Sequence, residues 1–501
     1  MRNLLAIVAV MTLLICHSGA LALEVQEVAT PPLPESPVFD DINCLATIDD
    51  IVSLIPALKE PLGHELGVMI WEASGRPDPA AHDALEVERL LQERGMCVPP
   101  NIGKADEAGL DAIATIIRHR QEQGWATPVL CQGWGQVFFR PERSPAHQPP
   151  AEQDAKRFPC IARYEEPLLG EKARVEANLD ALVARGIAPE IFLMDWELWY
   201  RAVWPGDGSG FAAALEQALA CPVCREQLPA EYLQSPADLM RGLEILRGEI
   251  ARRAFAEPLK QRFPDAHIGN YFCGSHVRSD EPLTECSYVM GWHGSGFDFS
   301  QPRAYGNFWR YHRSAEHVGW NVFRQALGEY SHMARHQVGD EYQVPWSTRI
   351  LSYEPVEPFE AQGGSGPLQV WAWPRESYRE YQRHVLLRGA KGLCVFQTNR
   401  AVEGNRVAYL TELQDVAGVF AEMREFADIL REGTPMNLDA PPGEAYSSEG
   451  AVVWSGMATN DRAVVRTVSF TGSTEEVTIA AFGEEITLQA PPEGQTWLIT
   501  K

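Results

Sequence analysis

Two acidic residues stand two positions apart at the end of an apolar run. The stretch "IFLMDWELWYRAVW" covers residues 191–204 and places Asp195 and Glu197 on either side of Trp196. Residues two apart in a strand point to the same side, so both carboxylates are predicted to face one space. Two like charges close together beside indole rings are expected to raise the pKa of one of the two carboxyl groups. An acid that stays protonated near neutral pH can protonate a glycosidic oxygen, so the pair predicts general acid catalysis.

Tryptophans and polar residues at other predicted strand ends extend this candidate site. Indole rings are flat apolar plates on which the C–H faces of sugar rings stack, although ordinary core packing is the alternative for each of them. Polar side chains at strand ends can hydrogen-bond sugar hydroxyls. The predicted carbohydrate-binding residues are Trp71, Glu72, Trp134, Trp196, Trp199, Trp292, His293, Trp373 and Asn399, and Gln132 and Gln397 are further candidates.

Eight apolar runs alternate along the chain with segments in which apolar residues recur every three or four positions. This alternation is typical of parallel strands joined by helical crossovers. The sequence therefore predicts an α/β fold, a (β/α)8 TIM-type barrel over residues 61–432, with irregular insertions near 140–165, 200–235 and 293–310. The strands are predicted at 66–73, 97–102, 127–134, 190–197, 266–272, 286–292, 347–354 and 392–399.

A barrel gives the acidic pair a defined place. Catalytic groups of such barrels lie where strands end at the carboxyl face, and Asp195 and Glu197 end the fourth predicted strand. The alternative is an open doubly wound sheet, which carries a glycine-rich phosphate-binding turn after its first strand. The stretch "WEASGRPDPA" at 71–80 does not have the G-x-G-x-x-G pattern, which favours the barrel.

The two ends of the chain have a different character. Period-two alternation between turn residues predicts a small antiparallel β domain of the sandwich type over 433–501, a structural cap or a carbohydrate-binding module. Residues 23–60, with "ATPPLPESP", are predicted to be an extended lead-in. Residues 1–22 read as a signal peptide, which predicts a secreted or periplasmic protein. No later segment is apolar over the roughly 18 residues that a membrane span needs.

Charge and cysteine usage limit the partners and cofactors. The formal net charge of −25 disfavours nucleic acids and anionic membranes and leaves a carbohydrate as the expected partner. The histidines show no metal-ligand spacing, so neither a catalytic metal nor another cofactor is predicted. Cys221 and Cys224 form a lone C-P-V-C without a second ligand pair for zinc, which predicts a local disulfide. A second disulfide is predicted between Cys273 and Cys286.

The segment "MDWELWYRAVW" resembles the strand-4 signature of hyaluronidases, in which D-W-E is followed by further tryptophans. More broadly it is similar to the D-x-E end of the chitinase motif, although Glu190 and Leu193 occupy the places of the upstream aspartates. The resemblance implies retention assisted by the substrate. Glu197 would protonate the leaving oxygen, Asp195 would orient the acetamido group of an N-acetylhexosamine, and Tyr271 would hydrogen-bond near the attacking oxygen.

Two other interpretations remain open. The predicted seventh strand ends in "STRILSYEP" with Glu354, and many retaining glycosidases place the acid/base after strand 4 and a nucleophile after strand 7, about 5–5.5 Å apart. Glu197 and Glu354 would then share the reaction, although such enzymes carry Asn where this chain has Trp196. The third interpretation is a non-catalytic carbohydrate-binding barrel, because the fold alone does not guarantee turnover.

Overall fold

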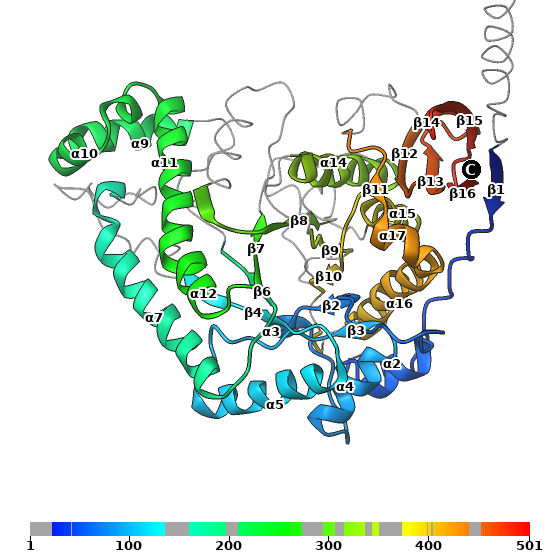
Figure 1. Cartoon of the computed structure of the whole chain (residues 1–501), viewed down its shortest axis with the longest axis horizontal. Helices are drawn as coiled ribbons and strands as arrows, with labels where there is room; N and C mark the ends of the chain where they lie inside the picture. Colours follow the sequence, from blue (N-terminus) through cyan, green and yellow to red (C-terminus); the bar gives the residue numbers. More distant parts are fainter. Residues whose placement is uncertain are drawn as a thin grey trace, which may run out of the picture.

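A computed structural model of the chain shows a barrel with a smaller β domain beside it (Figure 1). Five predicted site residues, Glu197, Trp199, Trp292, His293 and Glu354, lie outside the part of the chain that the structure describes, as do Cys273 and Cys286. The described residues are 23–41, 43–135, 160–196, 209–272, 294–305, 315–335, 343–349, 373–397, 399–401, 404–439 and 452–501.

Eight parallel strands form the barrel. Their spatial order is β3-β2-β10-β9-β8-β7-β6-β4. The two outer members of this order also meet, because Leu130 pairs with Asn101 just after β3 and its backbone N–H donates to the carbonyl of Pro100 at 2.8 Å. The sheet therefore closes, and the predicted (β/α)8 barrel is confirmed. The strands are β2 (Val68–Ile70), β3 (Met96–Cys97), β4 (Pro128–Leu130), β6 (Ile191–Met194), β7 (His267–Phe272), β8 (Phe299–Tyr305), β9 (Trp346–Thr348) and β10 (Leu393–Val395).

Helices surround the strands and cover their outer side (Figure 1). Local sequence signals start several of them: Asp83 and Asp106 each accept hydrogen bonds from backbone N–H groups of the first helical turn. No helix in the described ranges is both long and apolar enough to cross a bilayer. The helices named below are α2 (Ile48–Leu54), α4 (Ala84–Gln92), α5 (Glu107–Gln123), α7 (Glu165–Ala184), α9 (Ser209–Ala220), α10 (Pro222–Gln227), α11 (Pro236–Ala251), α12 (Glu257–Arg262), α14 (Ala315–Arg335), α15 (Arg375–Leu386), α16 (Asn405–Met423) and α17 (Ala427–Glu432).

Alternate residues of each strand pack on opposite sides. One buried cluster gathers residues from strands all around the barrel, among them Leu193, Phe299 and Trp346, and is the barrel interior. Their neighbours Phe192 and Met194 instead pack with residues of the surrounding helices. Whether a side chain points into the barrel or towards the helices is thus set by its odd or even position along the strand.

The sixth strand differs from the prediction. The structure places β8 (Phe299–Tyr305) between β7 and β9, within a segment predicted to be an irregular insertion. The predicted strand at 286–292 lies outside the described residues. The apolar pattern of β8 is interrupted by Gln301, Pro302 and Arg303, so a search for apolar runs does not find this strand. Its strand conformation depends on pairing with β7 and β9 on its two sides.

The β domain contains a five-stranded antiparallel sheet in the order β1-β16-β13-β12-β11 and a hairpin of β14 and β15. This confirms the antiparallel character predicted for the C-terminal part. The edge strand comes from the other end of the chain, because β1 pairs with β16 (Figure 1). The strands are β1 (Glu24–Val28), β11 (Thr434–Pro435), β12 (Val452–Ala458), β13 (Arg462–Ser469), β14 (Glu475–Ala481), β15 (Glu484–Ala490) and β16 (Gln495–Thr500).

The segment 23–60 is therefore more than the extended lead-in predicted from its prolines. Besides β1, it forms α2, whose Ile48 and Ile51 are fully buried in the core beside α4 and α16. Thr47 and Asp50 cap this helix reciprocally, a local signal present in the sequence "TIDD". Both ends of the segment thus anchor it to the folded body.

Candidate active site

Asp195 lies at the carboxyl end of β6, at the mouth of the barrel. Ile191 and Leu193 belong to the interior cluster, so Asp195, two residues further on, is on the same side. Its side chain is half-buried, and the amide Nε2 of Gln132 donates to its Oδ2 at 3.3 Å. The structure therefore places this predicted catalytic carboxylate where barrel enzymes hold their reacting groups.

A row of polar side chains continues from Asp195 around the mouth. Asn101 Nδ2 and Lys104 Nζ both donate to Gln132 Oε1, at 3.4 and 3.0 Å. With its oxygen held by two donors, the amide of Gln132 must turn its Nε2 towards Asp195. The row ends at Glu72, whose Oε2 accepts the backbone N–H of Asn101 at 2.5 Å. Four successive strands, β2, β3, β4 and β6, thus each contribute a polar group at their carboxyl ends.

Glu72 is the second carboxylate that the described part of the mouth contains. Burial raises its pKa, and the backbone N–H of Asn101 and the nearby charge of Arg76 offset only part of that effect. Its side chain retains about a fifth of its accessible surface and lies 3.4 Å from Arg76 Nη1. A carboxyl group in this state is a potential proton donor as well as a hydrogen-bonding group for a ligand.

Two buried amides hold the backbone on either side of Asp195. Asn270 of β7 accepts the N–H of Trp196 at 3.0 Å and donates to its carbonyl at 3.2 Å. Gln301 of β8 donates to the carbonyl of Met194 at 3.2 Å. These positioning residues were missed from the sequence, and the available signal was a polar residue inside each of two barrel strands, "HIGNYF" and "FSQPRAY".

The indoles predicted as sugar platforms are enclosed by protein. Trp196 and Trp134 pack against Phe255 of the helix layer at ring-centroid distances of 5.0 and 6.4 Å. Trp373 packs between Tyr378 and Tyr381. All three are at most 1% exposed, so the structure assigns them to packing. For Trp196 the reason is strand parity, which turns it away from the barrel interior beside Asp195.

Trp71 lies inside the barrel, unlike Trp134, Trp196 and Trp373, but it is buried as they are. Its ring lies 4.4 Å from that of Trp346 and 5.8 Å from that of Phe396 inside the barrel. Both tryptophans are buried, whereas Phe396, at the end of β10, is half-buried. Beneath the mouth this aromatic group forms an apolar floor, and Phe396 is its accessible member.

The other predicted residues fall into separate places. The side chain of Asn399 accepts the backbone N–H of Ala46 and donates to its carbonyl, both at 3.0 Å, so it holds the chain just ahead of α2. Gln397 accepts a hydrogen bond from Thr348 at 3.0 Å at the ends of β10 and β9. Tyr271 lies in β7 and pairs with Gln301 of β8. Hydrogen bonds through Asn101 and Gln132 thus join Glu72 to Asp195.

A hollow of about 520 Å³ lies at the opposite end of the barrel. It is lined at the amino ends of β6 and β7 by Glu190, Ile191 and His267. Glu190 accepts a hydrogen bond from Thr127 Oγ1 at 3.2 Å and lies 3.4 Å from His64 Nε2. Ligands of such barrels bind at the carboxyl face, so we place the candidate active site at the mouth and assign no chemistry to this hollow.

The closed strand order and its carboxylate-bearing mouth define a (β/α)8-barrel protein. No protein-family model matches the chain, and a search of curated proteins found no match. Among solved structures, the α-amylase from Geobacillus thermoleovorans is 9% identical, with 87% of this chain and 98% of that chain covered and a TM-score of 0.42. The cyclic α-maltosyl-(1→6)-maltose hydrolase from Arthrobacter globiformis is 13% identical, with 78% of each chain covered and a TM-score of 0.37. At such scores the barrel assignment rests on the strand pairing itself.

Proposed function

We propose that this protein is a secreted glycoside hydrolase that cleaves a polysaccharide or oligosaccharide with retention of configuration. The observation that carries the proposal is the position of Asp195, at the carboxyl end of β6 on the interior side, with Gln132 donating to its carboxylate. Glu197 follows two residues later in the sequence and is proposed as the general acid/base. The amides of Asn270 and Gln301 support this assignment, because they hold the backbone of Met194 and Trp196 on either side of Asp195, directly before Glu197 in the sequence.

In the proposed reaction Asp195 accepts the N–H of the substrate's acetamido group. This makes the acetamido oxygen a better nucleophile, which forms a bond to the anomeric carbon as the glycosidic bond breaks. Glu197 gives its proton to the leaving oxygen. It then takes a proton from the incoming water, whose oxygen bonds to the anomeric carbon as the bond to the acetamido oxygen breaks, and the original anomeric configuration is restored. A carboxylate already oriented by an amide donor suits the assisting role, because it is set to accept a hydrogen bond without rearrangement.

The alternative gives the role of nucleophile to Glu354. In the structure β9 (Trp346–Thr348) covers the start of the strand predicted at 347–354, and Glu354 lies outside the described residues. The hydrogen-bonded row at the mouth includes Asp195, which stands two residues before the proposed acid/base in the sequence, and this supports the assisted mechanism.

Three variants separate these mechanisms. Release of reducing ends from glycans with and without N-acetylhexosamine is measured for Glu197→Gln, Asp195→Asn and Glu354→Gln. The proposal expects strong losses in the first two and a small change in the third. Loss in Glu354→Gln with full activity in Asp195→Asn would establish the two-glutamate mechanism. Glu190→Gln, at the other end of β6, is the matched control.

A non-catalytic binding barrel would give another pattern. Wild-type protein would bind glycans on an array and release no product, and Glu197→Gln would change neither result. Secretion is tested separately, by determining the N-terminal residue of protein exported from the native host, which the proposal places near Leu23.

A further inference from the structure

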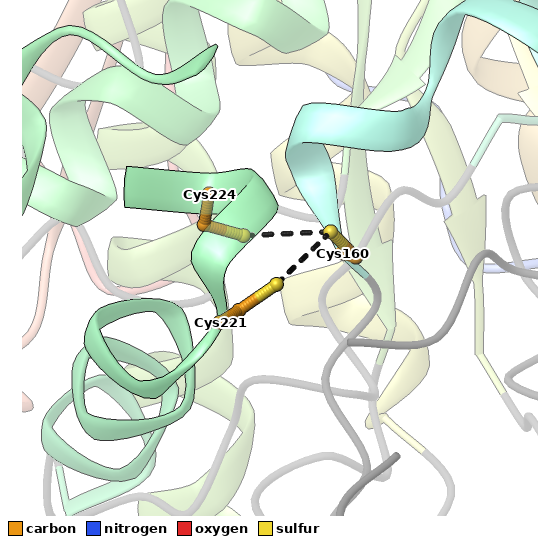
Figure 2. A group of neighbouring side chains, drawn as sticks. All are labelled: Cys160, Cys221 and Cys224. Atoms are coloured by element: carbon orange, nitrogen blue, oxygen red, sulfur yellow. Dashed lines mark hydrogen bonds between the residues drawn. The ribbon is translucent and has the colours of Figure 1, made fainter. Parts of the chain in front are cut away.

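Three cysteines from two distant segments meet at one point (Figure 2). Cys160 stands just ahead of a short 3-10 turn and α7, whereas Cys221 and Cys224 flank the start of α10. The Sγ atom of Cys160 lies 3.4 Å from that of Cys224 and 4.0 Å from that of Cys221. All three Sγ atoms lie within 4.8 Å of one another, and Figure 2 shows them pointing towards a common centre.

These separations differ from those of a disulfide. A sulfur–sulfur bond is about 2.05 Å long. The structure forms no disulfide between Cys221 and Cys224, contrary to the prediction from the C-P-V-C pattern. Thiolates bound to one tetrahedral Zn²⁺ at about 2.3 Å are about 3.8 Å apart, and the two measured distances lie on either side of that value.

Local structure explains how the C-P-V-C pair serves such a centre. Pro222 is the first residue of α10 and fits the fixed backbone angle of a helix start, so Cys221 precedes the helix and Cys224 lies in its first turn. Residues three apart on a helix lie on the same face, which brings both sulfur atoms to one side. Cys160 supplies the ligand from outside that the sequence pattern lacked, and all three side chains are buried to at least 99%.

The surroundings indicate why a metal would be useful here. Helices α9 and α10 form an excursion between β6 and β7, away from the barrel strands, and α11 returns to the barrel, where Ile250 and Ala251 pack in the cluster over β6 and β7 (Figure 1). The buried cluster at the excursion is small: besides the three cysteines it contains Ala214, Ala218, Leu228 and Leu239. Small apolar cores rarely hold a fold together without disulfides or a metal.

We propose that Cys160, Cys221 and Cys224 are ligands of a structural zinc ion that ties the start of α7 to the helical excursion. The three thiolates leave one position of the tetrahedron for a fourth ligand. Both tied segments belong to connections on the carboxyl side of the barrel, and α9 follows the stretch that begins with Asp195 and Glu197. The ion would thus brace the framework of the mouth without taking part in its chemistry.

Metal content tests the proposal independently of any enzymatic activity. Full-length protein purified without chelators is expected to contain about one zinc per chain by elemental analysis. Cys221→Ser and Cys224→Ser should each reduce this content at least about tenfold. Cys44→Ser changes a cysteine that lies elsewhere, beside Arg406, and should retain the zinc.

Wild-type protein provides a second measurement in case a variant fails to fold. Replacement of zinc by Co²⁺ should produce the thiolate-to-cobalt charge-transfer absorption and the intense visible bands of a tetrahedral site. The proposal would be overturned if the purified protein contained no zinc and if Co²⁺ added to it produced no such bands. A peptide map that links Cys160 to Cys221 or Cys224 by a disulfide would overturn it as well.

Discussion

The molecule holds buried carboxylates in two contrasting ways, at the barrel mouth and at the interface between the barrel and the β domain. At the mouth, Asp195 and Glu72 are oriented by neutral donors, an amide side chain and a backbone N–H. At the interface, Glu380 of α15 receives two hydrogen bonds from Arg466 of β13, at 2.7 and 2.8 Å, and a third from Arg383. At the mouth the closest charged group to Glu72 is Arg76, at 3.4 Å, whereas at the interface guanidinium groups donate directly to both oxygens of Glu380.

The pKa shifts follow this difference. Burial alone would raise the pKa of Glu380, but Arg466, His384 and Arg383 more than offset it and hold the pKa well below its usual range. Burial raises the pKa of Glu72, and its weaker partners do not reverse the shift. The pKa of a buried carboxyl is therefore lowered where guanidinium groups donate to it strongly, as at Glu380, and raised where burial outweighs its partners, as at Glu72.

The largest effect is expected from Asp195→Asn. The amide cannot serve as the charged acceptor of the proposed reaction, so kcat should fall about 10²–10⁴-fold. The melting temperature should change little, because Asp195 is half-buried and the amide of Gln132 can also donate to the side-chain oxygen of an asparagine. Kinetics on the best glycan substrate and a thermal melt of the same samples measure both. A variant that loses its fold and its activity together would contradict the contrast between the two regions.

Arg466→Met should produce the opposite pattern. It leaves Glu380 buried without its main partner, and breaking such a pair costs about 3–5 kcal/mol of unfolding free energy. Urea denaturation measures the loss, and kcat per folded molecule should remain unchanged. In the double variant Arg466→Met, Glu380→Met most of the stability should return, because no buried charge is left. Failure of the second change to restore stability would show that Arg466 acts by packing alone.

Acid should weaken the interface through His384. Burial lowers the pKa of His384 to about 4, although Glu380 opposes the shift. An unfolded chain binds this proton near pH 6.5, so the contribution is present above that pH and is lost as the pH falls towards 4. The loss amounts to about 3 kcal/mol. His384→Gln should flatten this part of the stability profile measured by urea denaturation, and an unchanged slope would assign the acid sensitivity to other groups.

Glu72 should respond to pH in the other direction, with the smallest effect. Its pKa is raised on folding, so its contribution to stability is present at acidic pH and is lost as the pH rises through the raised value. In Glu72→Gln the difference in stability between acidic and neutral pH should shrink, because an amide does not titrate, and the local structure should persist, because the amide oxygen can still accept the N–H of Asn101. Urea denaturation at several pH values measures it, with Glu166→Gln, an exposed residue of α7, as the control. A steeper fall in the variant would reverse the sign assigned to Glu72.

Features encoded in contiguous residues could be predicted from the sequence. The alternation of apolar strands and amphipathic helices specifies the barrel, since each element has its own period. The period of two within β6 also places Asp195 on the interior side, because strand parity depends only on neighbouring residues. The turn-rich period-two pattern after residue 433 predicts the antiparallel sheet in the same way.

Only the tertiary structure decided what depends on distant residues. Neighbouring segments decide that the polar residues 299–305 form strand β8 and that β1 pairs with β16. They also decide which tryptophans are enclosed, namely Trp134, Trp196 and Trp373. The same holds for Cys160, which the fold brings to within 4.0 Å of a cysteine 61 positions away. Local periodicity carries no information about which separate segments meet in the folded chain. The closed barrel assembles the mouth, and the packing of two of its connections assembles the cysteine cluster.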